Sequence, residues 1–145
     1  MSTHETDFYT WTQEQAALFR QGRIAEVDVV NIIDEIESMG ASQRGELTNR
    51  LAVLLAHLLK WQYEPERRGK SWRSTIVEQR ERASEVLQEN PGLKPSLGKA
   101  KEKAYRYARQ IAIRETMLDE DTFPPECPWS FEQIMNADFW PSDNH

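Results

Sequence analysis

The sequence predicts an all-α protein, a single-domain bundle of four to five mostly antiparallel helices with a C-terminal extended segment and a short helix docked on it. Apolar residues recur at helical spacing along nearly the whole chain, and no stretch alternates Val, Ile and Thr as a strand does. The chain has 145 residues. A chain of this length can bury roughly two thirds of its surface without a disulfide or a metal. One helical domain over residues 1–145 is therefore expected.

Glycines mark the ends of the first two predicted helices. The first covers residues 11–21 and ends at Gly22, and the second runs from about residue 25 to residue 39, with Gly40 as its C-terminal stop. Apolar residues of the second helix share one face and are expected to point into the core: Val29, Ile32, Ile33, Ile36 and Met39.

The third predicted helix, residues 42–63, is the longest and should form the centre of the core. It ends before Pro65, because proline removes a backbone donor and clashes with the preceding turn. Its apolar stripe consists of five leucines: Leu47, Leu51, Leu54, Leu55 and Leu58.

Two further long helices are predicted over residues 71–89 and from about residue 95 to residue 116. Alanines recur on the inner face of the second of these, which is typical of tight helix packing. The last part, residues 119–145, is extended around its prolines, contains a short capped helix from about Ser130 to Ala137, and is expected to wrap over the bundle.

Charge is distributed in three blocks, although the net charge is only -6. Residues 1–60 hold five Lys and Arg against nine Asp and Glu, residues 61–114 hold 13 against seven, and residues 115–145 hold none against eight. Two interpretations remain open. The acidic ends can lie against the basic central helices and neutralise them, or the central block can present an anion-binding face.

The most basic stretch is the loop around residues 67–73. It contains Arg67, Arg68, Lys70 and Arg73, close to the start of a predicted helix, where free N–H groups and the helix dipole favour an anion. A phosphate-binding P-loop is excluded, because the letters Gly69-Lys70-Ser71 lack both the earlier glycine and the preceding strand. Two tryptophans beside the loop, Trp61 and Trp72, could anchor a partner.

His57 is the only histidine away from the ends of the chain, and it should lie at an edge of the core. A cluster of His57 with Glu35 and Arg80 is the weak candidate for a catalytic site, with Glu35 as the expected partner of the partly buried Arg80. The more conservative interpretation is a packed structural histidine and a salt bridge.

Neither a metal site nor a cofactor is expected. The other histidines are at positions 4 and 145, and Leu54 stands three residues before His57, where helical metal sites usually carry Glu. Cys127 lies between prolines, and the sequence places no activating base beside it, so both a packing role and a reactive thiol stay open.

Several segments in the same order resemble the bacterial and cyanobacterial family catalogued as domain-of-unknown-function family 29: "DFYTWTQEQAALFRQGR", "EIESMG", "LAVLLAHLLKWQYEPERRGKSW", "TIVEQR" and "FPPECPWSFEQIMNADFWP". The resemblance spans nearly the whole chain and implies a small, single-domain helical protein. It implies no activity, substrate or cofactor.

The sequence favours a noncatalytic protein–protein interaction or adaptor module, or a small homo-oligomer, that works through the loop 64–73 and the edge around His57 and Trp61. The first alternative is an anion or nucleic-acid binder that uses the basic loop 67–73, with Lys101, Arg106 and Arg109 as further contacts. The second is an enzyme built on His57, Glu35 and Arg80. A cytoplasmic protein without a membrane span is expected, because the chain has one cysteine, its first residues are unlike a secretory signal, and its longest apolar run is too short to cross a bilayer.

Overall fold

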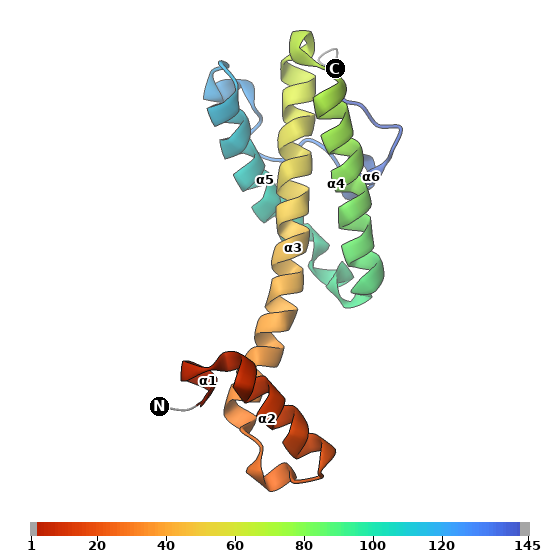
Figure 1. Cartoon of the computed structure of the whole chain (residues 1–145). Coiled ribbons are helices and arrows are strands. Elements are labelled where there is room, and N and C mark those ends of the chain that lie inside the picture. Colours follow the sequence, from red (N-terminus) through yellow and green to blue (C-terminus); the bar gives the residue numbers. More distant parts are fainter. Residues whose placement is uncertain (1–2, 143–145) are drawn as a thin grey trace. The chain divides into compact units, whose positions relative to one another are not determined.

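A computed structural model describes residues 3–142 and confirms the all-α prediction (Figure 1). Within these residues every regular element is helical. Six α-helices and four 3-10 helices follow one another in this order: α1 (Thr3–Thr6), α2 (Phe8–Arg20), η1 (Ile24–Glu26), α3 (Val29–Tyr63), η2 (Pro65–Arg67), α4 (Lys70–Glu89), η3 (Pro91–Ser96), α5 (Leu97–Glu115), η4 (Glu120–Thr122) and α6 (Phe131–Met135).

The chain divides into two compact units, with the boundary between Ala41 and Ser42. The N-terminal unit holds α1, α2 and the first part of α3, and the C-terminal unit holds the rest. The single domain over residues 1–145 therefore stays a prediction.

The predicted break between the second and third helices is wrong, because α3 runs without interruption through Gly40 and Ser42. A glycine inside a helix costs only about 1 kcal/mol relative to alanine, so it weakens a helix without ending it. Gly40 keeps a negative φ, whereas Gly22 adopts a φ of 71° and does end α2 as predicted. Of these two glycines, only Gly22 adopts the left-handed backbone conformation, which residues with a side chain disfavour.

In the C-terminal unit α4 runs antiparallel to both α3 and α5, and these two helices run in the same direction (Figure 1). Their inner faces share a continuous apolar core. The predicted leucine stripe of α3 is fully buried, and Ile76 and Ala83 of α4 belong to the same core. The alanines expected to allow tight packing on α5 are buried as well: Ala104, Ala108 and Ala112.

The C-terminal segment docks on this bundle as predicted. Phe123, Trp129 and Ile134 belong to the core cluster. Ser130 caps α6 by accepting a hydrogen bond from the Gln133 backbone, while the Gln133 side chain accepts one from the Ser130 N–H. This reciprocal pair satisfies two N–H groups that the first turn would otherwise leave free.

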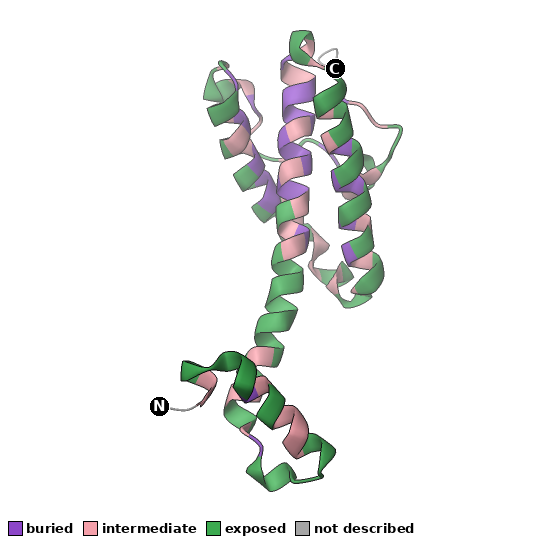
Figure 2. Ribbon diagram, viewed as in Figure 1, coloured by how far each residue is buried: buried purple, intermediate pink, exposed green. Residues whose placement is uncertain are grey.

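The N-terminal unit has a small interior that centres on Trp11. The indole Nε1 donates to Asp28 Oδ2 at 3.0 Å, and Gln15 accepts a hydrogen bond from the Asp28 backbone. Trp11 and Val27 are its buried apolar residues among those described. The predicted inward face of the second helix is wrong, because Val29, Ile33, Ile36 and Met39 are all exposed. Figure 2 shows the first part of α3 mostly in green, the colour of exposed residues.

Candidate functional site

The basic loop does not present four free cations. Arg68 donates from Nε to the Trp61 carbonyl at 2.6 Å, and the Arg73 guanidinium lies over the Trp140 ring, 4.6 Å from its centroid. Arg67 lies 3.8 Å from a carboxylate oxygen of the buried Glu64. Of the four cations of this loop, only Lys70 is exposed without such a contact. Arg68 and Arg73 are therefore engaged with tryptophans of the fold, whereas Arg67 and Lys70 stay exposed to solvent with at most a long contact.

Trp61 and Trp140 form the centre of this cluster. Their rings lie 4.8 Å apart between centroids, and Arg68, Arg73 and Arg80 all stack over one or both of them. Trp61 is only 8% exposed. It therefore holds the C-terminal segment to the bundle, and little of its surface is left for a partner.

Four basic residues hold the C-terminal segment through main-chain carbonyls. Arg80 donates to the carbonyls of residues 134 and 139, Lys101 to that of residue 129, Arg109 to those of residues 120 and 123, and Arg68 to that of residue 141. The acidic side chains described in residues 119–138 are exposed. The interpretation that acidic side chains neutralise the basic helices is therefore wrong for the tail residues 119–138, because main-chain carbonyls accept the hydrogen bonds of these cations.

His57, Glu35 and Arg80 have separate partners. Glu35 Oε1 lies 2.8 Å from Nε2 of His4, within the N-terminal unit, and Arg80 donates to carbonyls. Glu35 as the partner of Arg80 is therefore wrong. His57 donates from Nδ1 to the Val53 carbonyl at 2.9 Å, and burial lowers its pKa below the ordinary value of 6.5. The imidazole is neutral at physiological pH.

Lys60 and Glu115 form an ion pair near His57. The Lys60 ammonium lies 2.6 Å from Glu115 Oε1 and 5.4 Å from the centroid of the Trp72 ring. Trp72 is thus a neighbour of this buried cation. The hydrogen bond to Lys60 lowers the pKa of the Glu115 carboxyl, and Lys60 and Glu115 shift the pKa of His57 in opposite directions.

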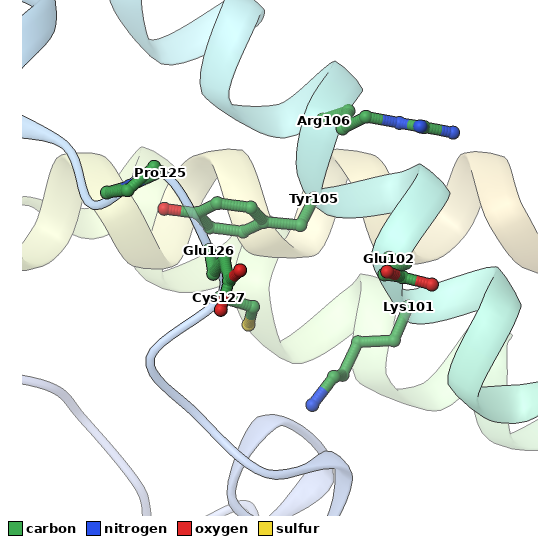
Figure 3. A pocket seen from close by; sticks show the side chains of 7 residues that line it. All are labelled: Lys101, Glu102, Tyr105, Arg106, Pro125, Glu126 and Cys127. Atoms are coloured by element: carbon green, nitrogen blue, oxygen red, sulfur yellow. The ribbon is translucent and has the colours of Figure 1, made fainter.

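A hollow of about 350 Å³ lies between α5 and the segment that follows η4 (Figure 3). Tyr105 reaches across to this segment and donates to the Pro124 carbonyl at 2.5 Å, while Arg106 points away from it. Burial raises the pKa of both the Tyr105 phenol and the Cys127 thiol. Neither group is prepared to act as a nucleophile or base near neutral pH.

The outer side of α5 carries a basic stripe. Lys99, Lys103, Arg106 and Arg114 are exposed and follow one another at spacings of four, three and eight residues, which places them on one face of the helix. Arg114 approaches Glu115 at 3.8 Å. Of the cations expected to assist anion binding, Lys101 and Arg109 hold the C-terminal segment, and only Arg106 belongs to the stripe.

The N-terminal unit carries most of the exposed apolar surface. Nine of its described large apolar residues are exposed, against three in the described part of the C-terminal unit. The nine are Phe8, Tyr9, Phe19, Ile24, Val29, Val30, Ile33, Ile36 and Met39, and together they are called the apolar surface below. Sequence reasoning assigned part of this surface to the core. The acidic character of residues 1–41, with two Lys and Arg against eight Asp and Glu, is the signal that could have set this segment apart.

Two further kinds of feature, a metal site and a membrane-spanning helix, have no candidate among the described residues. Among residues 3–142, no group of three or more His, Cys, Asp and Glu side chains lies close enough together to hold a metal ion. No helix in that range is both long and apolar enough to span a bilayer. The fold and these surfaces define a small all-α protein with an acidic, apolar N-terminal unit and a basic helical bundle.

The chain belongs to a family that is described as Domain of unknown function DUF29, whose model matches residues 3–140. The resemblance seen in the sequence is thereby confirmed. The comparisons with curated proteins and with solved structures gave no match.

Proposed function

We propose that this protein is a noncatalytic interaction module whose main contact surface is the apolar surface of the N-terminal unit. The observation that carries the proposal is the exposure of nine large apolar side chains in a unit of about 40 residues. Val29, Ile33 and Ile36 lie on one side of α3, and an exposed apolar face of this kind marks a site of association, because its contact with water is unfavourable.

The chemistry of the C-terminal unit supports the same conclusion. Four of its cations donate to main-chain carbonyls, its histidine is bonded to its own helix, and the thiol of Cys127 has a raised pKa. The loop 64–73 and the edge around Trp61 offer less to a partner than the sequence suggests, because Arg68 and Arg73 stack on buried or half-buried tryptophans.

Site-specific photocrosslinking tests the proposal. A photoreactive amino acid is placed at Val30 or Ile36, which are 73% and 62% exposed, and the full chain is irradiated in cells of its native host. The matched control is Val77, an exposed apolar residue on α4 of the C-terminal unit. We expect a dominant protein adduct at the first two positions and only background at Val77. Background at all three positions would overturn the proposal.

A second candidate function is the binding of a polyanion through the basic stripe of α5, supported by the exposure of Lys99, Lys103 and Arg106 without ion-pair partners among the described residues. Binding of this kind releases counterions and must weaken steeply with salt. Fluorescence anisotropy with a labelled DNA duplex should show such binding, and Lys103→Glu with Arg106→Glu should abolish it. Lys94→Glu, at an exposed lysine outside the stripe, is the control. Absent or salt-independent binding would exclude this function.

A further inference from the structure

We infer that the occupant of the apolar surface is the same surface of a second copy of this chain, so that the protein is a symmetric homodimer joined through its N-terminal units. The inference rests on the proposed function, since it names the partner of the surface proposed there. It is argued from the interior of the unit, the arrangement of the surface, its area and its charge.

The interior of the N-terminal unit is too small for its length. Trp11 and Val27 are its only buried apolar residues among those described, with Phe8 stacked against Trp11 at 5.6 Å between ring centroids. Units of about 40 residues usually need disulfides, metals or oligomerisation to be stable. The chain has a single cysteine, and no metal-binding group lies among residues 3–142, so oligomerisation is the one of these three means that the described residues leave available.

The exposed residues of α3 form a coherent face. At 3.6 residues per turn, Val29, Ile33 and Ile36 lie within an arc of about 60°. Val30 and Met39 extend this face on either side. Such a face can pack against its own copy, because in a two-fold interface the same patch of both copies is in contact and each apolar residue can meet an apolar residue of the other copy.

The area of the surface is sufficient for a dimer. The nine side chains are on average somewhat more than half exposed, which leaves on the order of 700 Å² of apolar area in contact with water. A standard interface buries roughly 800 Å² per partner, of which a little more than half is apolar. About two thirds of the apolar surface would therefore be enough.

The second copy also supplies the matching apolar face that the rest of the chain lacks. In the described part of the C-terminal unit, the exposed large apolar residues are Val77, Tyr107 and Met117. They lie on three different segments of the chain. A second copy of the N-terminal unit exposes the same nine large apolar residues, and it is present wherever the first copy is. Symmetric pairing of this kind is the commonest form of homo-oligomer.

The net charge of the N-terminal unit predicts how the affinity of the dimer depends on salt. Residues 1–41 carry a net charge of -6, so two N-terminal units repel each other. Asp34 and Glu37 lie on α3 beside Val30 and are exposed, so this repulsion acts close to the face. Salt screens exposed charges over about 8 Å at physiological ionic strength. The dimer should therefore become tighter as salt is added, whereas docking of a basic partner would become weaker.

Sedimentation equilibrium of the full chain tests the inference. We expect a monomer–dimer equilibrium that shifts toward dimer with added salt. Ile33→Ser with Ile36→Ser should weaken association at least tenfold, while Val77→Ser should leave it unchanged. Circular dichroism checks that the double variant is folded. Asp34→Asn with Glu37→Gln leaves the apolar residues intact and should tighten the dimer at low salt, so it tests the same face without disturbing the fold.

A chain that stays monomeric at all concentrations and salt levels would overturn the inference, and so would a dimer that the double serine variant leaves intact. These outcomes are separable from failure of the proposed function. A monomer that still crosslinks through Ile36 to a different protein keeps the interaction role and rejects only the second copy. A monomer without crosslinks rejects both.

Discussion

The ammonium group of Lys60 lies 2.6 Å from Glu115 Oε1, and this pair joins the last turn of α3 to the last turn of α5. The Lys60 side chain is only 7% exposed, whereas that of Glu115 is 44% exposed. The cation is therefore the member of the pair that depends on its partner, because a buried charge without compensation is strongly unfavourable.

Replacing Glu115 should destabilise the C-terminal unit. Glu115→Ala leaves Lys60 buried without a counter-charge, and we expect a loss of about 1–3 kcal/mol, less than for a fully buried pair because water reaches Glu115. Glu115→Gln, which keeps an acceptor, should lose less. Urea unfolding measures the change, with Glu102→Gln on the exposed side of α5 as the control. Equal stability of Glu115→Ala and the wild type would contradict a role for the pair.

His57 should make folding stability fall as the pH decreases through 6.5. Burial lowers its pKa below 6.5 in the folded protein, so the unfolded chain binds the proton more readily. Stability is then fully present above pH 6.5 and falls as the pH decreases through that value. The lowered pKa values of Asp28 and Glu115 act only below about 4.5, so they do not contribute near pH 6.5. His57→Gln should flatten the profile of unfolding free energy, and an unchanged slope would refute this origin.

Two glycines inside α3 should weaken the helix locally. A Cβ atom at Gly40 or Gly45 would meet no atom within 4 Å, so alanine fits at both positions. Each substitution to alanine should stabilise the helix by about 0.5–1 kcal/mol. Slower amide hydrogen exchange over residues 36–45 is the expected observation. Gly22→Ala is the opposite control, because a φ of 71° strains any side chain, and it should destabilise the N-terminal unit.

Arg80 should be needed to hold the C-terminal segment. Its Nε donates to the Ile134 carbonyl at 2.8 Å and its Nη2 to the Phe139 carbonyl at 2.7 Å. Because hydrogen bonds from charged donors contribute more than neutral ones, we expect Arg80→Ala to cost about 2–3 kcal/mol. Amide exchange should accelerate over residues 131–141. Arg82→Ala, which removes only an exposed pair with Glu78, should leave that exchange as it is.

Cys127 should react slowly in the folded protein. Burial raises the pKa of its thiol, and Sγ lies 3.5 Å from the Trp129 carbonyl. Reaction with a disulfide reagent near pH 8 should therefore be much slower than that of the same chain unfolded in urea. A native rate as fast as the unfolded one would instead favour a reactive thiol and would reopen a chemical role for the hollow beside Tyr105.

The sequence predicts the C-terminal unit well because its pattern is redundant. The leucines of α3 recur over several turns, Pro65 marks the end of α3, and the predicted short helix does begin after Ser130 as its cap. Each of these signals acts over a few residues, and tertiary contacts in this unit do not oppose them.

The N-terminal unit is predicted less well for a physical reason. Helical periodicity shows that Val29, Ile33 and Ile36 share a face, but it does not show whether anything covers that face. Gly40 carries a similar ambiguity, since a glycine can either end a helix or continue it at a modest cost. For the candidate site, charge patterning identifies the basic residues but not their acceptors. Arg80 and Lys101 bind carbonyl oxygens, which every residue possesses and which no composition reveals.

The attachment of residues 120–141 through carbonyl groups has a consequence for how this family can diverge. Carbonyl oxygens are present whatever the side chain, so exchange of the acidic residues there for neutral ones would leave the anchoring geometry intact. Homologues could therefore differ widely in isoelectric point while they retain the same architecture. In each contact the cation on α4 or α5 would tolerate substitution less than the residue whose carbonyl accepts its hydrogen bond.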